Sequence, residues 1–353
     1  MRLRAACLLL ATLLLGGCQG AAYLGQAAIG QASLLAAREP LDRVIADPTR
    51  PQSLRDRLTL IRELRDFAGS ELGMGKLRGF SSFVATGRRS VVWNVVAAPE
   101  FAIDPLRWCF PVAGCVSYRG YFSRDGAERF ARLLAARGND TYVYGVSAYS
   151  TLGWFSDPVL DTWVQRSETE VAALVFHEFA HQIAWSKADT GFSEAFAQVV
   201  EREGVRRWLA ARGEDARYDA YVRRQSVDAE FAALVERTRN GLASLYAEPL
   251  TSEEKRVRKQ QLLAALREEY VARSRSWLPV DRRDGWMAGE LDNARLASVS
   301  NYEAQVPVLQ ALLAREHGEL AAFYRAARRL AALASADRAA ELAALGSPGP
   351  SLP

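Results

Sequence analysis

Two histidines and a glutamate in the middle of the chain are spaced so that they could hold a metal ion and move a proton. The segment runs His177-Glu178-Phe-Ala-His181, and the chain has only one other histidine, His317. On a helix, residues four apart project from the same face, so both imidazoles can reach one cation while Glu178 lies towards its open side. This spacing predicts a zinc site in which Glu178 acts as a general base.

The residues around this motif predict a buried helix. Ser167 and Glu170 have the spacing of a capping box, and the turns between Val171 and Ile183 are apolar almost all round. Polar side chains set into such a helix carry a large desolvation cost unless they are satisfied. Metal coordination therefore explains the motif better than two core histidines held by hydrogen bonds.

A hydrolytic zinc site usually takes three protein ligands and keeps one position for water, so a third ligand is needed. A turn at 190–191 would return a second apolar helix antiparallel to the first, with Glu194 in its opening turn beside the histidines. Glu201 lies two turns further along the same face, where it could instead accept a hydrogen bond from a histidine or be an ordinary surface carboxylate. Asp189 is the third candidate, although its loop would have to fold back over the histidines.

If such a site hydrolyses a carbonyl compound, it also needs a hydrogen-bond donor for the charge that develops on the carbonyl oxygen. Tyr302 and His317 are candidates, and Tyr142, Tyr144 and Tyr149 precede the metal helix in the chain. Most tyrosines in a chain of this kind belong to the core or the sheet. We take Tyr302 as the candidate catalytic donor.

The N-terminus predicts an export signal followed by lipid attachment. A basic start is followed by the apolar run Ala5–Leu15, which is too short to cross a bilayer core of about 30 Å, and then by Leu15-Gly-Gly-Cys18. This last segment resembles a bacterial lipobox, which implies a signal peptide over residues 1–17 and acylation of Cys18. Gln19 follows the cysteine, and by resemblance to Gram-negative lipoproteins this favours the outer membrane, facing the periplasm.

The same assignment accounts for the four cysteines. One leaves with the signal peptide and Cys18 carries lipid, so Cys109 and Cys115 remain in an oxidising compartment. Pro111 and Gly114 lie between them and favour a tight loop that brings the two side chains within bonding range. A disulfide is predicted, with a metal clip or two unpaired thiols as the alternatives.

Composition limits the class of protein. The chain has 353 residues, 49% of them hydrophobic, which is enough to bury a large core and excludes wholesale disorder. Its 45 basic residues nearly cancel 41 acidic ones, and the formal charge of +4 gives no electrostatic case for nucleic acid as a partner. We expect one region over residues 18–353 that ends in a disordered tail, 347–353.

The expected fold class is α+β and mostly α. Helices are predicted at 21–38, 52–67 and 125–137, and from residue 167 onward nearly everything is helical, including 215–246, 252–277 and an Ala-rich segment, 302–345. Short β-prone runs at 82–85, 90–96, 118–122 and 141–144 predict one small sheet. The region thus divides into helices plus sheet (18–160) and a helical part with the metal helix (161–346).

Several motifs resemble known families. His177-Glu178-x-x-His181 with Phe192-Ser-Glu194-Ala-Phe-Ala is similar to the gluzincin metallopeptidases, whose second motif is typically Asn-Glu-x-Phe-Ala. The lipobox and three further stretches resemble the bacterial predicted-aminopeptidase lipoproteins; the stretches are Cys109–Tyr121, Gly153–Pro158 and Asn293–Ser298. Ser193 stands where many gluzincins have Asn, and the connection between the two helices is shorter than in the large aminopeptidases.

The resemblance implies a zincin-like fold, a Zn²⁺ cofactor bound by His177, His181 and Glu194, and a peptide substrate. The expected activity is that of a zinc-dependent peptidase, with an aminopeptidase as the implied type. The strand-like stretches 145–150 and 153–155 could pair with an extended peptide, although a buried structural strand explains them equally well. A zinc-dependent amidase of the cell envelope and a non-catalytic zinc-stabilised protein are the alternatives.

Overall fold

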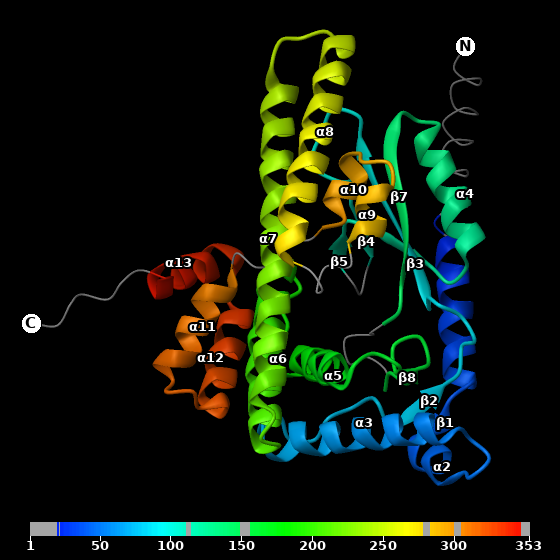
Figure 1. The fold of residues 1–353 in the computed structure, drawn as a ribbon, viewed down its shortest axis with the longest axis vertical. Coiled ribbons are helices and arrows are strands. Elements are labelled where there is room, and N and C mark those ends of the chain that lie inside the picture. The colour runs from blue at the N-terminus through cyan, green and yellow to red at the C-terminus, as the bar shows by residue number, and fades with distance from the viewer. Residues whose placement is uncertain are drawn as a thin grey trace, which may run out of the picture.

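The computed structural model describes residues 20, 22–110, 114–148, 156–277, 283–299 and 305–346, and it is mostly helical with small sheets (Figure 1). Several sequence predictions fall outside these residues, namely those for the signal peptide, Cys18, Tyr149, Tyr302 and the tail 347–353. None of the helices described is long and apolar enough to cross a membrane.

The described strands form three small sheets where the sequence analysis expected one. They are β1 (Glu39–Pro40), β2 (Ser82–Val84), β3 (Val92–Pro99), β4 (Trp108–Phe110), β5 (Gly114–Val116), β6 (Arg119–Tyr121), β7 (Asn139–Val146) and β8 (Val159–Leu160). The sheet orders are β1-β2-β8, β6-β3-β7 and β4-β5. The β-prone runs mark where strands form but do not determine their partners, and β2 pairs in parallel with the distant β8 because both carry fully buried apolar side chains.

The middle sheet is built on β3, and it is antiparallel throughout. Every residue of β3 pairs with β7, from Val92 opposite Val146 to Pro99 opposite Asn139. Helix α4 (Arg124–Ala135) covers one face, and its buried Ala127 packs against β3 in a separate apolar cluster. The chain turns after α4 at a glycine, Gly138, whose φ of 81° suits a residue without a side chain.

Helices make up the rest of the chain. The N-terminal part has a helix over residues 22–36, α2 (Leu41–Ala46) and α3 (Gln52–Ser70). The C-terminal part has α5 (Glu168–Ile183), α6 (Thr190–Ala211), α7 (Asp215–Ala247), α8 (Ser252–Trp277), α9 (Asp284–Ala288), α10 (Asn293–Ala297), α11 (Val306–Arg315), α12 (Leu320–Ala332) and α13 (Ser335–Gly346). Helices α7 and α8 form a long antiparallel pair along the longest axis of the molecule (Figure 1).

The Ala-rich segment at the C-terminal end is interrupted by two breaks in the described part. The chain leaves α11 through His317 and Gly318, whose φ values of 55° and 76° cannot continue a right-handed helix. It leaves α12 at Leu333, which is extended. The resulting helices α11, α12 and α13 lie on the far side of the α6–α7 region from the sheets (Figure 1).

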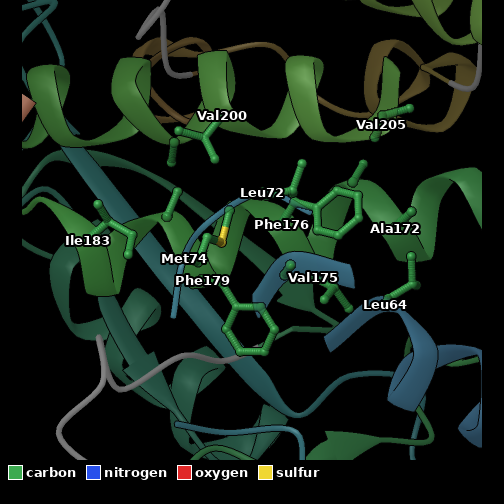
Figure 2. Close-up of a cluster of buried hydrophobic side chains, with 14 of the residues drawn as sticks. Leu64, Leu72, Met74, Ala172, Val175, Phe176, Phe179, Ile183, Val200 and Val205 are labelled. Atoms are coloured by element: carbon green, nitrogen blue, oxygen red, sulfur yellow. The ribbon is translucent and has the colours of Figure 1, made fainter. Parts of the chain in front are cut away.

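The largest core surrounds α5. Val175 and Phe176 of this helix are fully buried, and they are met by Leu64 of α3 and by Val200 and Val205 of α6. Figure 2 shows α5 and α6 side by side, running in opposite directions, with the apolar side chains between and below them. This is the antiparallel return predicted from the sequence, and it fixes the helix that carries the two histidines.

A buried polar cluster joins the α7–α8 pair to the middle sheet. Lys259 of α8 is 5% exposed and its Nζ donates to Asp140 of β7 at 2.6 Å. Asn293, at the start of α10, donates to the carbonyls of Pro99 and Glu100 and accepts from a tyrosine hydroxyl. Since these donors and acceptors are matched, the cluster holds the two parts of the fold together without leaving a buried charge alone.

Candidate metal centre

Helix α5 presents both histidines on one face. Its start is fixed by the predicted capping box, in which Ser167 Oγ accepts from the backbone N–H of Glu170 and the Glu170 carboxylate accepts in return. One turn separates His177 from His181, and their ring centroids lie 4.9 Å apart. Trp185 packs edge-on against the His181 ring, with 5.1 Å between the centroids. The rings are therefore held by the helix and by packing rather than by solvent-exposed contacts.

Helix α6 brings Glu194 to the same point. One carboxylate oxygen of Glu194 lies 3.3 Å from His177 Nε2 and the other lies 3.7 Å from His181 Nε2. Ligand atoms of the three residues are all within 4.8 Å of one another. In the part of the chain that the structure describes, this is the one group of three or more histidine, cysteine or acidic side chains close enough to share a metal ion.

These donors fit a zinc ion. Zinc–ligand bonds of about 2.0–2.1 Å at tetrahedral angles place neighbouring ligand atoms about 3.3–3.4 Å apart. The Glu194 carboxylate lies close to that separation from both imidazoles, with Oε2 3.3 Å from His177 Nε2 and Oε1 3.7 Å from His181 Nε2. Two imidazoles and one carboxylate are also the ligand set of catalytic zinc sites that keep a fourth position open.

Glu201 contacts the other nitrogen of His177. Its Oε2 lies 3.0 Å from His177 Nδ1, and its Oε1 accepts from the Tyr221 hydroxyl at 2.7 Å. Gln225, also on α7, lies 3.5 Å from the same Oε1. When Nδ1 donates to Glu201, the lone pair of Nε2 is directed towards Glu194 and the shared point between the ligands. Of the roles considered for Glu201, the geometry matches a hydrogen-bond acceptor for a candidate metal-binding histidine rather than a metal ligand or a surface carboxylate.

The electrostatics of the centre favour a cation. Burial works against protonation of His177, but its contacts with Glu194 and Glu201 outweigh burial and raise its pKa well above the ordinary value. Burial, with the neighbouring His177, lowers the pKa of His181 to about 4, so its lone pair is available. Burial raises the pKa of Glu194, but contacts with both histidines lower this pKa by more than burial raises it, so the carboxylate stays charged. The site thus concentrates negative charge that a metal ion can neutralise.

Asp189 is committed elsewhere, so the alternative that it serves as third ligand is not supported. Its Oδ1 caps α6 by accepting from the backbone N–H of Phe192 at 2.9 Å. Its Oδ2 accepts from Arg338 Nε at 3.1 Å. The loop does not fold back over the histidines, because capping α6 requires the carboxylate at the start of that helix.

Ser193 fixes the conformation of the short α5–α6 connection. Its side chain is fully buried, accepts from the backbone N–H of Ser186 at 3.0 Å and donates to the carbonyl of Asp189 at 3.1 Å. A hydroxyl can make both bonds within one tight turn. Ser193 therefore anchors the turn directly before Glu194.

Glu178 lines a small cavity together with Leu174 and Gln182, which lie one turn before and one turn after it on α5. The cavity measures about 20 Å³, room for about one water molecule, and its wall includes Ala148, Asp157, Phe179 and Gln182. Gln182 is held in this wall by Arg78, since its amide donates to the carbonyl of Arg78 at 2.6 Å and accepts from the N–H of the same residue at 3.0 Å. A carboxylate in such a cavity can take a proton from a water held there.

The structure does not bring the other candidate donors to the centre. Gly318, next to His317, is held by Arg207, which lies about 20 Å along α6 from Glu194 at about 1.5 Å per residue. His317 is therefore wrong as a candidate, because the end of α11 packs at the far end of α6. Tyr142 and Tyr144 stack on each other in β7 with 5.4 Å between centroids, as sheet residues do.

The predicted disulfide is present. Cys109 of β4 is bonded to Cys115 of β5, and the two face each other in the register of that hairpin. The hairpin explains the pairing, since opposite residues in an antiparallel pair have neighbouring side chains.

Several residues around the centre were not predicted from the sequence. Tyr221 and Gln225 lie in a long charged helix with no local pattern that marks them as partners of Glu201. Arg338 lies far along the chain in an Ala-rich segment. Gln182 had one usable signal, its place directly after His181.

Comparison with known proteins identifies a family. The model of a family described as "Putative aminopeptidase" matches residues 22–342, which is most of the chain. No curated protein and no solved structure matches.

Proposed function

This chain belongs to that aminopeptidase family, and on this premise we propose that it is a zinc-dependent peptidase, of the aminopeptidase type, whose metal is held by His177, His181 and Glu194. The observation that carries the proposal is the convergence of these three side chains. Two imidazole nitrogens lie 3.3 and 3.7 Å from one carboxylate in a partly buried position on two packed helices. Family membership supports a peptidase, and the donor set supports zinc.

A zinc ion held there would act as a Lewis acid on the scissile carbonyl and on the water that attacks it. Glu178 then has the role of general base, because it adjoins His177 on α5 and lines a cavity with room for about one water. It accepts the proton of the attacking water and passes it to the leaving amine. Glu201 keeps His177 oriented throughout.

The edge of the middle sheet is the proposed platform for the peptide. Among the described strands, β7 pairs with β3 on one side and forms an edge of its sheet on the other. Ala148, two residues after β7 ends, lines the cavity that contains Glu178. An extended peptide paired along β7 would thus run towards the general base. Tyr302 remains the proposed donor to the carbonyl oxygen, although it lies outside the described residues.

The test combines metal analysis with peptide digestion. The purified protein should carry about one zinc per molecule, and His177→Ala or His181→Ala should remove it. Glu178→Gln should keep zinc yet lose hydrolysis of a peptide library by several orders of magnitude. Glu168→Gln is the matched control, since it changes the same charge on the same helix far from the cavity. Near wild-type turnover in Glu178→Gln would disprove the general-base role.

A zinc-loaded protein that cleaves no peptides but hydrolyses cell-wall amides would replace the peptidase proposal with the amidase alternative. Acylation of Cys18 and attachment to the outer membrane are also proposals, supported by the lipobox-like segment alone. Intact-mass analysis of the mature protein tests them, because a mature species without acyl mass excludes lipid attachment.

A further inference from the structure

A buried arginine from the C-terminal helices contacts the start of the helix that carries Glu194. Arg338 of α13 has no exposed side-chain surface, and its Nε donates to Asp189 Oδ2 at 3.1 Å. Its Nη1 donates to the carbonyl of Leu333 at 3.0 Å, at the end of α12. The guanidinium also lies over the Phe192 ring, 5.7 Å from its centroid. A guanidinium so fully desolvated needs all of these contacts, so they hold Arg338 in one geometry.

Asp189 passes this constraint to the first turns of α6. While Oδ2 pairs with Arg338, Oδ1 accepts from the backbone N–H of Phe192, and the Asp189 carbonyl accepts from Ser193 Oγ. Glu194 is the next residue. A single carboxylate therefore links a fixed guanidinium to the backbone turn directly before the proposed zinc ligand.

A second arginine holds the other end of the α5–α6 connection. Arg328 of α12 donates from Nε to the carbonyl of Ile183, the last residue of α5, at 2.9 Å. His181 lies two residues earlier. The C-terminal helices thus contact both the end of the histidine helix and the start of the glutamate helix.

We propose that Arg338 is a positioning residue for the metal centre, acting through Asp189 to hold Glu194 at coordinating distance from His177 and His181. The inference rests on the proposed function, since it concerns Glu194 as a zinc ligand. It goes further because it proposes that the α11–α13 helices determine the distance between the ligands on α5 and the ligand on α6. Zinc ligand sets tolerate displacements of only about 0.2 Å, so a loosened α6 start weakens binding.

The experiment measures zinc dissociation constants by competition with a chelator, in the full chain. Arg338→Met keeps the length of the side chain and removes its charge. Asp189→Asn keeps the helix cap, because asparagine caps as well as aspartate, but weakens the ion pair. Each should weaken zinc binding about tenfold, the scale seen for residues that orient metal ligands. The double variant should lose no more than the larger single loss, because both changes break one link.

Arg329→Met is the matched control, since Arg329 is an exposed arginine of α12 and should leave zinc affinity unchanged. Thermal unfolding of the metal-free forms separates positioning from stability. A purely structural role would lower stability but leave unchanged both the zinc affinity of the folded protein and the visible spectrum of its Co²⁺ form. That result would overturn the proposal.

If Arg338→Met does not fold, Asp189→Asn and Arg338→Lys decide, because lysine keeps the charge but not the bonds to both Asp189 and Leu333. Unchanged zinc affinity in both variants overturns the inference, and weakened affinity in Asp189→Asn supports it. Failure of the wild type to bind zinc is a different outcome, since it removes the proposed function itself.

Discussion

Replacing Glu201 by glutamine changes the charge beside His177 while keeping the shape of the side chain. In the structure the Glu201 carboxylate accepts from His177 Nδ1 at 3.0 Å and from the Tyr221 hydroxyl at 2.7 Å, and it is 14% exposed. A glutamine can still accept from Nδ1 through its oxygen and donate to the Tyr221 oxygen through its amide. The hydrogen bonds thus survive, and what is lost is their charge-assisted part.

The expected loss follows from that difference. Hydrogen bonds to charged groups contribute about 1.5–3 kcal/mol and neutral ones about 0.5–1.5 kcal/mol. The change should therefore cost zinc binding about 1–1.5 kcal/mol, roughly a tenfold rise in the dissociation constant. Glu201→Ala leaves Nδ1 without an acceptor and should approach the upper end of the 10–100-fold range for such partners.

Competition with a chelator at fixed pH measures both variants against Glu194→Gln, which should bind zinc far more weakly than either. Glu203→Gln is the matched control. Glu203 lies on the same helix and its side chain is 13% exposed, but its carboxylate pairs with Arg206 and Arg207 rather than with a histidine. It should lose stability and keep zinc affinity. If Glu201→Gln binds zinc as tightly as the wild type, or as weakly as Glu194→Gln, our account of His177 is refuted.

Two further predictions concern pH and packing. Burial opposes protonation of His177, but contacts with Glu194 and Glu201 raise its pKa well above the ordinary value, so zinc must displace a proton. The affinity for zinc should therefore fall as pH falls, up to about tenfold per pH unit below that pKa. Zinc titrations between pH 6 and 8 in two buffers reveal the proton release, and a pH-independent affinity would contradict this prediction. At Gly204 of α6, an added Cβ would lie 2.7 Å from Phe176 and 3.0 Å from Leu72. Gly204→Ala should therefore destabilise the protein by about 1–3 kcal/mol in urea unfolding. If the packing relaxed instead, the helix propensity of alanine would stabilise the protein by about 1 kcal/mol, which would contradict this prediction.

The metal helix was predictable because its signals are local. Ser167 and Glu170 form a capping box three residues apart, and the two histidines lie one turn apart within an apolar run. The start of α6 followed from the same kind of pattern, which is why Glu194 was found. In each case, neighbours in sequence determine the geometry.

The surroundings of the centre were not predictable in this way. Tyr221 reaches Glu201 from the next helix, and Arg338 reaches Asp189 across 149 residues of chain. Charge and helix propensity at those positions are satisfied equally well by a solvent-exposed face, so no pattern distinguishes them. Strand pairing was not predictable for the same reason: the apolar residues of β2 indicate that Phe83 is buried but not that β8 lies beside it.

The location of the two histidines on a deeply buried helix has a consequence for how the protein can evolve. Val175 and Phe176 pack against α3 and α6, and this packing also determines where the imidazoles lie. Substitutions in the core therefore also change the geometry of the site. A lineage could lose the metal ligands and keep the fold, but it could not remodel the centre of the fold and keep the ligands in place. Under the proposed function, substrate specificity can change at the sheet edge and in the loops around the cavity, where substitutions leave α5 untouched.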